Sequence, residues 1–311
     1  MKVGILGTGF GAYHASIYKK ISSIESVKIF GRNVDKLSNI KADLGIDVTN
    51  NIDDILNDPD IDLIDVCLPN HLHTEYVIKA LEKGKNVFCE TTISSSLEGA
   101  EAIAAAENKY GKRVFINLFI LFHPSYRYLH QVIANNELGK LREIHVKRLT
   151  PAIWGSLGFE TIVTNLMIHE IDFVTWILGE PDNIYAVGSS KNNNEANVTA
   201  LLKYSDTAAV ITGSSMFPKS YPFTVEYEAI FDNGVIIYHE EFSKNGNSRN
   251  LTKYTSYEKE EIISDQGRNP YEEVIRHVLE CCDTGNETIL SVDRALSSFR
   301  TALRIKGLIY K

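Results

Sequence analysis

The chain has 311 residues, of which 44% are hydrophobic and 23% are charged. This length and composition are typical of a globular protein with two domains and large cores. The formal net charge of -8 argues against a nucleic-acid surface, which is normally basic. No apolar run reaches the ~20 residues that cross a bilayer, so we expect no membrane partner.

The cysteines give no sign of a disulfide framework or a metal centre. The chain has Cys67, Cys89, Cys281 and Cys282, and no pair has the C-x-x-C spacing of a metal or redox site. No signal peptide precedes Lys2, because the first apolar run already has the pattern of a strand. We therefore expect free thiols, no metal ion and a cytoplasmic location.

The N-terminal residues have the pattern of a dinucleotide-binding turn. An apolar strand, Lys2–Leu6, is followed by glycines at the spacing G-x-G-x-x-A and then by a helical pattern. Gly7 permits a tight turn, Gly9 leaves room for a pyrophosphate, and Ala12 lets helix and strand pack closely. Free N–H groups at the helix start would face the phosphates. The loop residues expected to bind are Gly7, Thr8, Gly9, Phe10, Gly11 and Ala12. The alternative is a glycine-rich turn that binds nothing.

The end of the second predicted strand, Ser26–Phe30, indicates which dinucleotide is preferred. In this fold an acidic residue there accepts from the 2′-hydroxyl of NAD, whereas an arginine accommodates the 2′-phosphate of NADP. No acid occupies this strand end, and Arg32 and Asn33 follow it. The planar guanidinium group suits a phosphate, so we favour NADP(H) over NAD(H). The alternative is that Arg32 is only a solvated loop charge.

Strand and helix patterns alternate through the rest of the first half. The expected strands are Ile61–Leu68, Asn86–Cys89 and Arg113–Asn117, and the expected helices are Val34–Leu44, Asn51–Asn57, Thr74–Lys83 and Leu97–Tyr110. This alternation predicts a Rossmann-type, doubly wound parallel sheet of the α/β class, covering residues 1–119. Ligands of such sheets lie beyond the carboxyl ends of the strands, which places the loops at Gly7, Arg32, Pro69 and Glu90 around one crevice.

Beyond Arg142 the pattern changes to strands joined by short turns. The expected strands lie around Ile144 and Val146 and at Ala196–Tyr204, Thr207–Met216, Thr224–Phe231 and Val235–His239. Hairpin-linked strands predict an antiparallel sheet. Two polar segments, Lys191–Asn194 and Ser243–Asn250, are expected to be loops. Amphipathic helices are expected at Pro270–Asp283 and Ser291–Ile309. The second domain is expected to cover residues 120–311.

Several motifs, in this order along the chain, resemble the Gfo/Idh/MocA oxidoreductases. They are the glycine loop, the run Leu68-Pro69-Asn70-His71-Leu72-His73, Glu90, Asn117 with Phe122-His123-Pro124, Glu137-Leu138-Gly139, and His169-Glu170-Ile171-Asp172. The resemblance spans nearly the whole chain. It implies a C-terminal α+β domain with an open, mostly antiparallel sheet, used to form a homodimer or homotetramer.

The same resemblance implies the reaction and its residues. It implies hydride transfer between a nicotinamide and a sugar-like or other small carbonyl or alcohol substrate. His169 would donate or accept the proton and Asn165 would position the substrate. Besides the glycine loop, the implied cofactor-binding residues are Arg32, Asn33, Leu68, Pro69, Asn70, His73, Glu90 and Thr91.

The chain departs from the family pattern at two catalytic positions. The family usually has Glu-Lys-Pro after the fifth strand, but here Thr91 follows Glu90, and its hydroxyl cannot supply a cation. Asn165 stands where the family usually has Asp, and an amide cannot titrate. Another polar group of the presumed crevice could replace the lysine; the candidates are Tyr13, His14, His123 and Tyr126. The alternatives to a sugar dehydrogenase are an imine reductase of the same family and a dinucleotide-binding sensor or partner protein without hydride chemistry.

Overall fold

The computed structural model describes residues 1–153, 155–243, 246–262 and 269–310. It divides into two compact units, Met1–Phe119 with Asn269–Leu296, and Ile120–Arg268 with Ser297–Lys311. The first break lies where the sequence placed the domain boundary. The second domain was expected to run without interruption from 120 to 311, whereas Asn269–Leu296 packs with the first unit.

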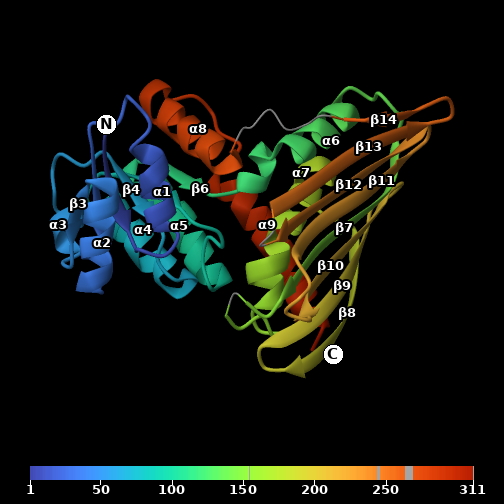
Figure 1. The fold of residues 1–311 in the computed structure, drawn as a ribbon, viewed down its shortest axis with the longest axis horizontal. Coiled ribbons are helices and arrows are strands. Elements are labelled where there is room, and N and C mark those ends of the chain that lie inside the picture. The colour runs from blue at the N-terminus through green and yellow to red at the C-terminus, as the bar shows by residue number, and fades with distance from the viewer. Residues whose placement is uncertain (154, 244–245, 263–268, 311) are drawn as a thin grey trace. The chain divides into compact units, whose positions relative to one another are not determined.

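The first unit contains a six-stranded parallel sheet in the order β3-β2-β1-β4-β5-β6. Its strands are β1 (Lys2–Leu6), β2 (Ser26–Phe30), β3 (Asp47–Thr49), β4 (Leu63–Val66), β5 (Asn86–Cys89) and β6 (Val114–Ile116) (Figure 1). This confirms the predicted doubly wound architecture, in which the strand order reverses between β1 and β4. The short strand β3 had no expected counterpart in the sequence.

Helices pack with these strands in the first unit, and the ends of several of them follow from the sequence. They are α1 (Gly11–Tyr18), α2 (Val34–Leu44), α3 (Asp53–Leu56), α4 (His73–Glu82), α5 (Leu97–Tyr110) and α8 (Pro270–Thr284), with a short 3-10 turn at Asn70–Leu72. The side chains of Asn33 and Ser96 cap the starts of α2 and α5, and Gly45 and Gly111 end the same helices with positive φ angles. Cap and glycine signals of this kind explain why helix bounds were predictable here.

Arg113 explains why the distant segment after residue 269 belongs to the first unit. This side chain precedes β6 and donates to the backbone oxygens of Cys281 and Asn286, at 2.6 Å each. The backbone N–H of Ile116 also donates to Leu290 O at 2.9 Å. These bonds join residues more than a hundred positions apart, so no local pattern in the sequence announces them.

The second unit contains an eight-stranded sheet in the order β14-β13-β12-β11-β7-β10-β9-β8 (Figure 1). Its strands are β7 (Leu141–Pro151), β8 (Asn183–Asn192), β9 (Glu195–Lys203), β10 (Ala208–Phe217), β11 (Phe223–Phe231), β12 (Gly234–Ser243), β13 (Gly246–Thr255) and β14 (Lys259–Glu261). All neighbours pair antiparallel except β7 and β10. The mostly antiparallel sheet is as predicted. The expected loop over Ser243–Asn250 was wrong at Ser243, the last residue of β12, and from Gly246 onward, because β13 pairs there with β12. The expected loop over Lys191–Asn194 was wrong at Lys191 and Asn192, which end β8 and pair toward β9. Residues 244–245 lie outside the described residues.

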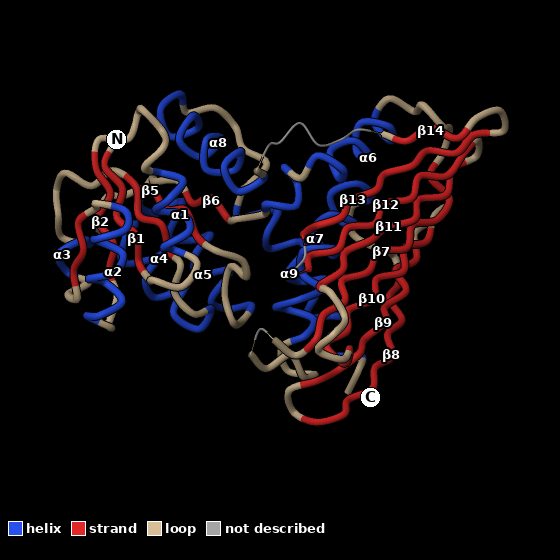
Figure 2. The backbone as a smooth tube through the Cα atoms, viewed as in Figure 1, coloured by secondary structure: helices blue, strands red, loops and turns tan. Residues whose placement is uncertain are grey.

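One face of this sheet is covered by helices, and the other carries none of the described helices (Figure 2). The helices are α6 (Pro124–Ala134), α7 (Ile168–Leu178) and α9 (Val292–Leu308), and a π-helical segment (Ile162–Met167) leads into α7. On the covered face Ile211, Val146, Tyr227 and Tyr238 form a buried row across four strands. The alternation of buried and exposed positions along each strand follows from this one-sided cover. No helix in the described part of the chain is long and apolar enough to cross a membrane.

Candidate active site

The glycine turn after β1 is held against the backbone of the neighbouring strand. Gly7 has a φ of 113°, and a Cβ there would lie 2.4 Å from the carbonyl oxygen of Cys67, just beyond β4. The Gly7 N–H donates to Phe30 O at the end of β2. Only glycine satisfies both the positive φ and the close approach.

The rest of the turn leaves an open space at the start of α1. Gly9 is exposed and a Cβ there would meet nothing within 4 Å, so the space above it is free. Gly11 begins α1, and a Cβ there would lie 2.8 Å from Ile5, which keeps the helix close to the sheet. The N–H groups at a helix start beside an open glycine are the arrangement that binds a pyrophosphate. Thr8, between Gly7 and Gly9, and Ala12, directly after Gly11, are partly exposed.

The other predicted cofactor loops lie at the carboxyl ends of β2, β4 and β5, as the sheet topology requires. Arg32 and Asn33 are exposed beyond β2, and the Asn33 side chain is used to cap α2. Beyond β4, Leu68 and Asn70 are partly exposed and Pro69 is exposed.

The buried side chain of His73 connects the loop after β4 with the loop after β5. Its side chain is buried, with Nδ1 at 2.7 Å from Thr92 O and Nε2 at 2.7 Å from Leu68 O. It therefore fixes the loop after β4 against the loop after β5. Because both ring nitrogens are already in contact with the backbone, a role of His73 in shaping the loops is better supported than direct cofactor contact.

Glu90, directly after β5, is the outer member of a buried polar network. Its Oε1 accepts from Asn117 Nδ2 at 2.7 Å and lies 3.1 Å from Nε2 of the fully buried His14. On the other side of the ring, His14 Nδ1 lies 2.8 Å from Asp65 Oδ2. The neutral thiol of Cys67, whose pKa is raised well above its usual value by burial, donates to Asp65 Oδ1 at 3.2 Å.

Thr91, the residue after Glu90, contributes no charge to the carboxyl edge of the parallel sheet. Its hydroxyl donates to Asn117 O at 2.6 Å and is therefore committed to the backbone beyond β6. Within the described residues of the first unit, His14 is the imidazole in contact with the Glu90 carboxylate. Of the residues considered as substitutes for the family's lysine, Tyr13 belongs to the first unit, where it is exposed, whereas His123 and Tyr126 belong to the second, where both are buried.

His169 and Asn165 belong to the second unit, around the start of α7. Asn165 lies in the π-helical segment and is exposed, and His169 is partly exposed one turn later. Beneath them Arg148 from β7 donates from Nε to both carboxylate oxygens of Glu170, at 2.9 and 2.7 Å. Burial and the Arg148 charge hold the pKa of His169 well below its usual value, so the ring is neutral at neutral pH.

The sequence missed two members of the Glu90 network. Asp65 was read only as part of a strand, and Asn117 only as a strand end and part of a family motif, whereas the structure places both in the network. Asp65 could have been found, because a lone carboxylate inside the apolar run Leu63–Val66 needs a buried partner. His14 was considered only as a replacement proton donor.

No metal was expected, yet within the described residues His14, Cys67 and Glu90 offer ligand atoms within 4.8 Å of one another. They do not converge on one point around the ring. Cys67 Sγ is 3.5 Å from Nδ1, which also faces Asp65, whereas Glu90 is next to Nε2. This arrangement fits a hydrogen-bonded ion network better than a metal centre.

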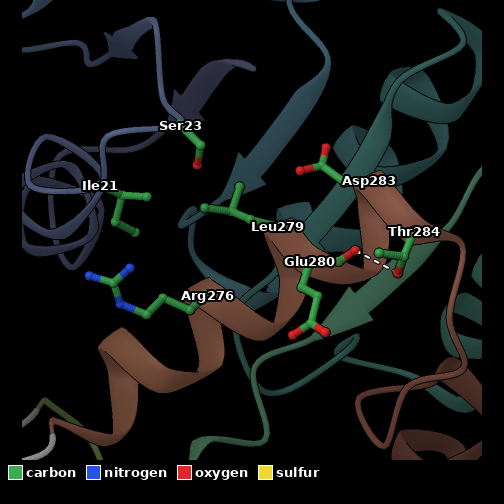
Figure 3. A pocket seen from close by; sticks show the side chains of 7 residues that line it. All are labelled: Ile21, Ser23, Arg276, Leu279, Glu280, Asp283 and Thr284. Carbon is green, nitrogen blue, oxygen red and sulfur yellow. Dashed lines mark hydrogen bonds between the residues drawn. The ribbon is translucent and has the colours of Figure 1, made fainter.

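A separate cavity of about 280 Å³ lies between the loop after α1 and the C-terminal half of α8 (Figure 3). Ile21 and Ser23 line it from the loop, and Arg276, Leu279 and Asp283 are among its residues on α8. Since Ile21 and Ser23 precede β2, the cavity is at the amino edge of the sheet. It is therefore not part of the crevice at the glycine turn.

The parallel sheet, its reversal point and its glycine turn define a Rossmann-fold dinucleotide-binding protein. The family description "Oxidoreductase family, NAD-binding Rossmann fold" matches residues 1–118, and "GFO/IDH/MocA C-terminal domain" matches residues 126–237. The chain belongs to the Gfo/Idh/MocA oxidoreductase family.

Similar proteins agree with this placement. The chain is 29% identical over 185 residues to inositol 2-dehydrogenase of Serratia proteamaculans (strain 568), covering 58% of this chain and 55% of that protein. The chain thus matches about half the length of this relative. In fold it is similar to UDP-N-acetylglucosamine 3-dehydrogenase from Acidithiobacillus ferrooxidans, with a TM-score of 0.84, 20% identity, and 99% and 97% of the two chains covered. It is also similar to apo scyllo-inositol dehydrogenase from Lactobacillus casei, with a TM-score of 0.80, 21% identity, and 100% and 96% covered.

Alanine substitutions at two glycines of the turn should have different effects on stability. Gly7→Ala places a Cβ against the Cys67 carbonyl at a positive φ, and we expect it to lower the free energy of unfolding by at least about 2 kcal/mol. Gly9→Ala meets no neighbour and should change it by less than about 0.5 kcal/mol. Urea unfolding of both variants measures this, and equal losses would contradict the described turn.

Proposed function

We propose that the protein is an NAD(P)-dependent oxidoreductase that acts on a ring hydroxyl or carbonyl of an inositol- or sugar-like substrate. The observation that carries this proposal is the open glycine turn at the reversal point of the sheet, with Glu90 beside it at the same edge. The named activities of the similar proteins support the substrate class. Free cysteines throughout the chain support a cytoplasmic location.

The residues at the carboxyl edge fit a dinucleotide. The N–H groups at the start of α1 and the space over Gly9 suit the pyrophosphate, and Arg32 suits a 2′-phosphate because no acidic side chain stands at the end of β2. NADP(H) is therefore the favoured cofactor. When bound, the nicotinamide supplies or accepts the hydride. Glu90 and Thr91 would border its ribose.

The residues around α7 fit the substrate end of the reaction. His169 is neutral, so its imidazole can accept a proton from a substrate hydroxyl during oxidation. The exposed amide of Asn165 can donate or accept a hydrogen bond and orient the substrate without changing charge. Since Thr91 offers no ammonium group, an imine, which is itself basic, is a second candidate substrate. The alternative to an enzyme is a dinucleotide-binding sensor or partner protein that has no hydride chemistry.

Arg32 should decide between the two cofactors. We expect Arg32→Ala to weaken NADPH binding about tenfold, the loss of one charge-assisted phosphate contact, and to leave NADH binding nearly unchanged. Fluorescence titration measures both affinities. Lys41→Ala, an exposed cation in the last turn of α2, is the control and should change neither. Tighter binding of NADH than NADPH by the unmodified protein would contradict the preference, and binding of neither would remove the proposal.

His169 should affect turnover without affecting cofactor binding. With NADP⁺ and a panel that includes myo-inositol and scyllo-inositol, we expect His169→Ala to lower kcat by about a hundredfold or more. The pKa of His169 lies well below its ordinary value, so the ring stays neutral and able to accept a proton as the pH falls through about 6.5. We therefore expect kcat/KM to stay level over this range and to decline only at lower pH. His145→Ala, on the sheet face without helices, is the control. Turnover within about threefold of the unmodified protein would exclude His169 as the proton acceptor.

The sheet face without helices supports a homodimer or homotetramer. Apolar side chains are exposed on it, including Tyr185 and Leu201, which are directly opposite each other on β8 and β9, and Ile237 on β12. An exposed apolar surface of this kind is typical of an interface between copies of a chain. We expect Leu201→Glu to shift the mass measured by light scattering toward the monomer. Tyr257→Glu, at an exposed turn, should not. A monomeric unmodified protein would contradict this proposal.

A further inference from the structure

Asp65 is a charged residue within a strand of a parallel sheet, where side chains are normally apolar because both faces are covered. It is the third residue of β4, the strand next to β1 at the centre of the parallel sheet, and its side chain is fully buried. In register it lies between Ile5 of β1 and Phe88 of β5, so apolar side chains flank it on both sides. A buried carboxylate is costly unless it is paired, so this residue requires a compensating group.

His14 of α1 supplies the compensation. Its Nδ1 lies 2.8 Å from Asp65 Oδ2, and its ring stacks on Phe88 with the centroids 5.5 Å apart. Burial by itself lowers the pKa of His14, but the charge and hydrogen bond of Asp65 outweigh it, and the pKa is raised well above its usual value. His14 is therefore an imidazolium at neutral pH, with a proton on each ring nitrogen.

The second proton of this imidazolium is directed toward Glu90. Among the described groups, Nε2 makes no well-aligned hydrogen bond and has its ion-pair contact with Glu90 Oε1, at 3.1 Å. Asn117 Nδ2 donates to the same oxygen at 2.7 Å. One carboxylate oxygen of Glu90 is thus held from two sides. Within the described residues Oε2 has no hydrogen bond, and the side chain is 19% exposed at the carboxyl edge.

We propose that Asp65 and His14 are positioning residues that hold the Glu90 carboxylate charged and oriented, as an acceptor for a hydroxyl or amide group of the bound dinucleotide. This inference rests on the proposed function. Ligands of a doubly wound sheet lie where its strand order reverses, between β1 and β4. Glu90 follows β5, the strand beside β4, and the buried pair stands directly behind it. The Asp65–His14 pair thus supplies a buried cation, the His14 imidazolium, next to Glu90. Thr91, which follows Glu90, cannot supply one.

Other titratable groups also face the His14 ring and bear on its charge. Cys67 Sγ lies 3.5 Å from Nδ1, and Tyr18 is buried near Asp65. Burial raises the pKa of both groups well above its usual value, so both stay protonated at neutral pH. Tyr271 of α8 contacts the ring edge, with centroids 6.5 Å apart. Asp65 and Glu90 are therefore the carboxylates that set the state of His14.

The first test is the charge of His14, measured by NMR on protein labelled with ¹⁵N-histidine. In the unmodified protein we expect the His14 ring to be an imidazolium at neutral pH, where an unperturbed histidine is mostly neutral. In Asp65→Asn the carboxylate is absent and burial dominates, so the ring should be neutral at the same pH. A neutral His14 ring in the unmodified protein at neutral pH overturns the inference, and this outcome does not depend on any variant or cofactor.

The second test is NADP⁺ binding between about pH 5.5 and about pH 8.5, across the histidine range. We expect Asp65→Asn to bind about fivefold more weakly than the unmodified protein at the alkaline end and to recover toward equality at the acidic end, where His14 regains its proton. The ratio of the two dissociation constants at each pH cancels titration of the cofactor's own phosphate. Glu90→Gln should weaken binding at every pH. Glu75→Gln, an exposed carboxylate of α4, is the matched control and should give a ratio of one throughout.

The outcomes separate this inference from the proposed function. A weakening in Asp65→Asn that does not vary with pH assigns Asp65 to fold stability alone and overturns the inference, while the proposed function stands. Equal binding by Glu90→Gln and the unmodified protein overturns it as well. Failure of the unmodified protein to bind either NADP⁺ or NAD⁺ removes the proposed function, and the inference with it.

Discussion

The close approach of the first turn to the neighbouring strand is the constraint on which the crevice depends. Gly7 brings its Cα against the Cys67 carbonyl at a positive φ, which turns the chain sharply from β1 into α1. This places the start of α1 over the point where the strand order reverses. It also places His14, one turn into the helix, directly over β4. The phosphate-sized space at Gly9 and the ion network behind Glu90 both follow from this single turn.

The chain departs from the family pattern at Thr91 and Asn165, and each unit has a buried charge near a residue proposed for the site. Thr91 cannot carry charge, and its hydroxyl is bonded to the backbone. The first unit nevertheless contains a buried cation, His14, paired with Asp65 one layer below. In the second unit burial, together with the charge of Arg148, keeps His169 neutral, and Arg148 itself is paired with the buried Glu170 of α7. In both units a buried cation thus lies next to a residue proposed for the site, His14 next to Glu90 and Arg148 next to His169.

The comparisons establish the family, whereas the arguments for the cofactor and the substrate rest on individual residues. Two family descriptions together match most of the chain and place it in the Gfo/Idh/MocA family. The curated relatives are matched over about half their length, and the fold neighbours share about a fifth of their residues with this chain. The residues of the site must therefore carry the argument for cofactor and substrate, and Arg32 and His169 are the ones whose chemistry discriminates.

The sequence by itself determined the parallel sheet, most helix bounds and the glycine turn, because these depend on local signals. Caps such as Asn33 and Ser96, C-terminal glycines and apolar periodicity act within a few residues. It also determined that Thr91 and Asn165 break the family pattern. Whether the residues predicted at the site bind a dinucleotide or substrate stays a prediction.

Only the tertiary structure decided which distant groups meet. It placed Asn269–Leu296 with the first unit through Arg113, extended β13 across a segment whose polar composition favours a loop, and joined Asp65 to His14 and Glu90. Each of these depends on contacts between residues far apart in the chain. Their energies come from pairing buried charges and backbone groups that no local pattern records, which is why the network behind Glu90 became visible only in the folded protein.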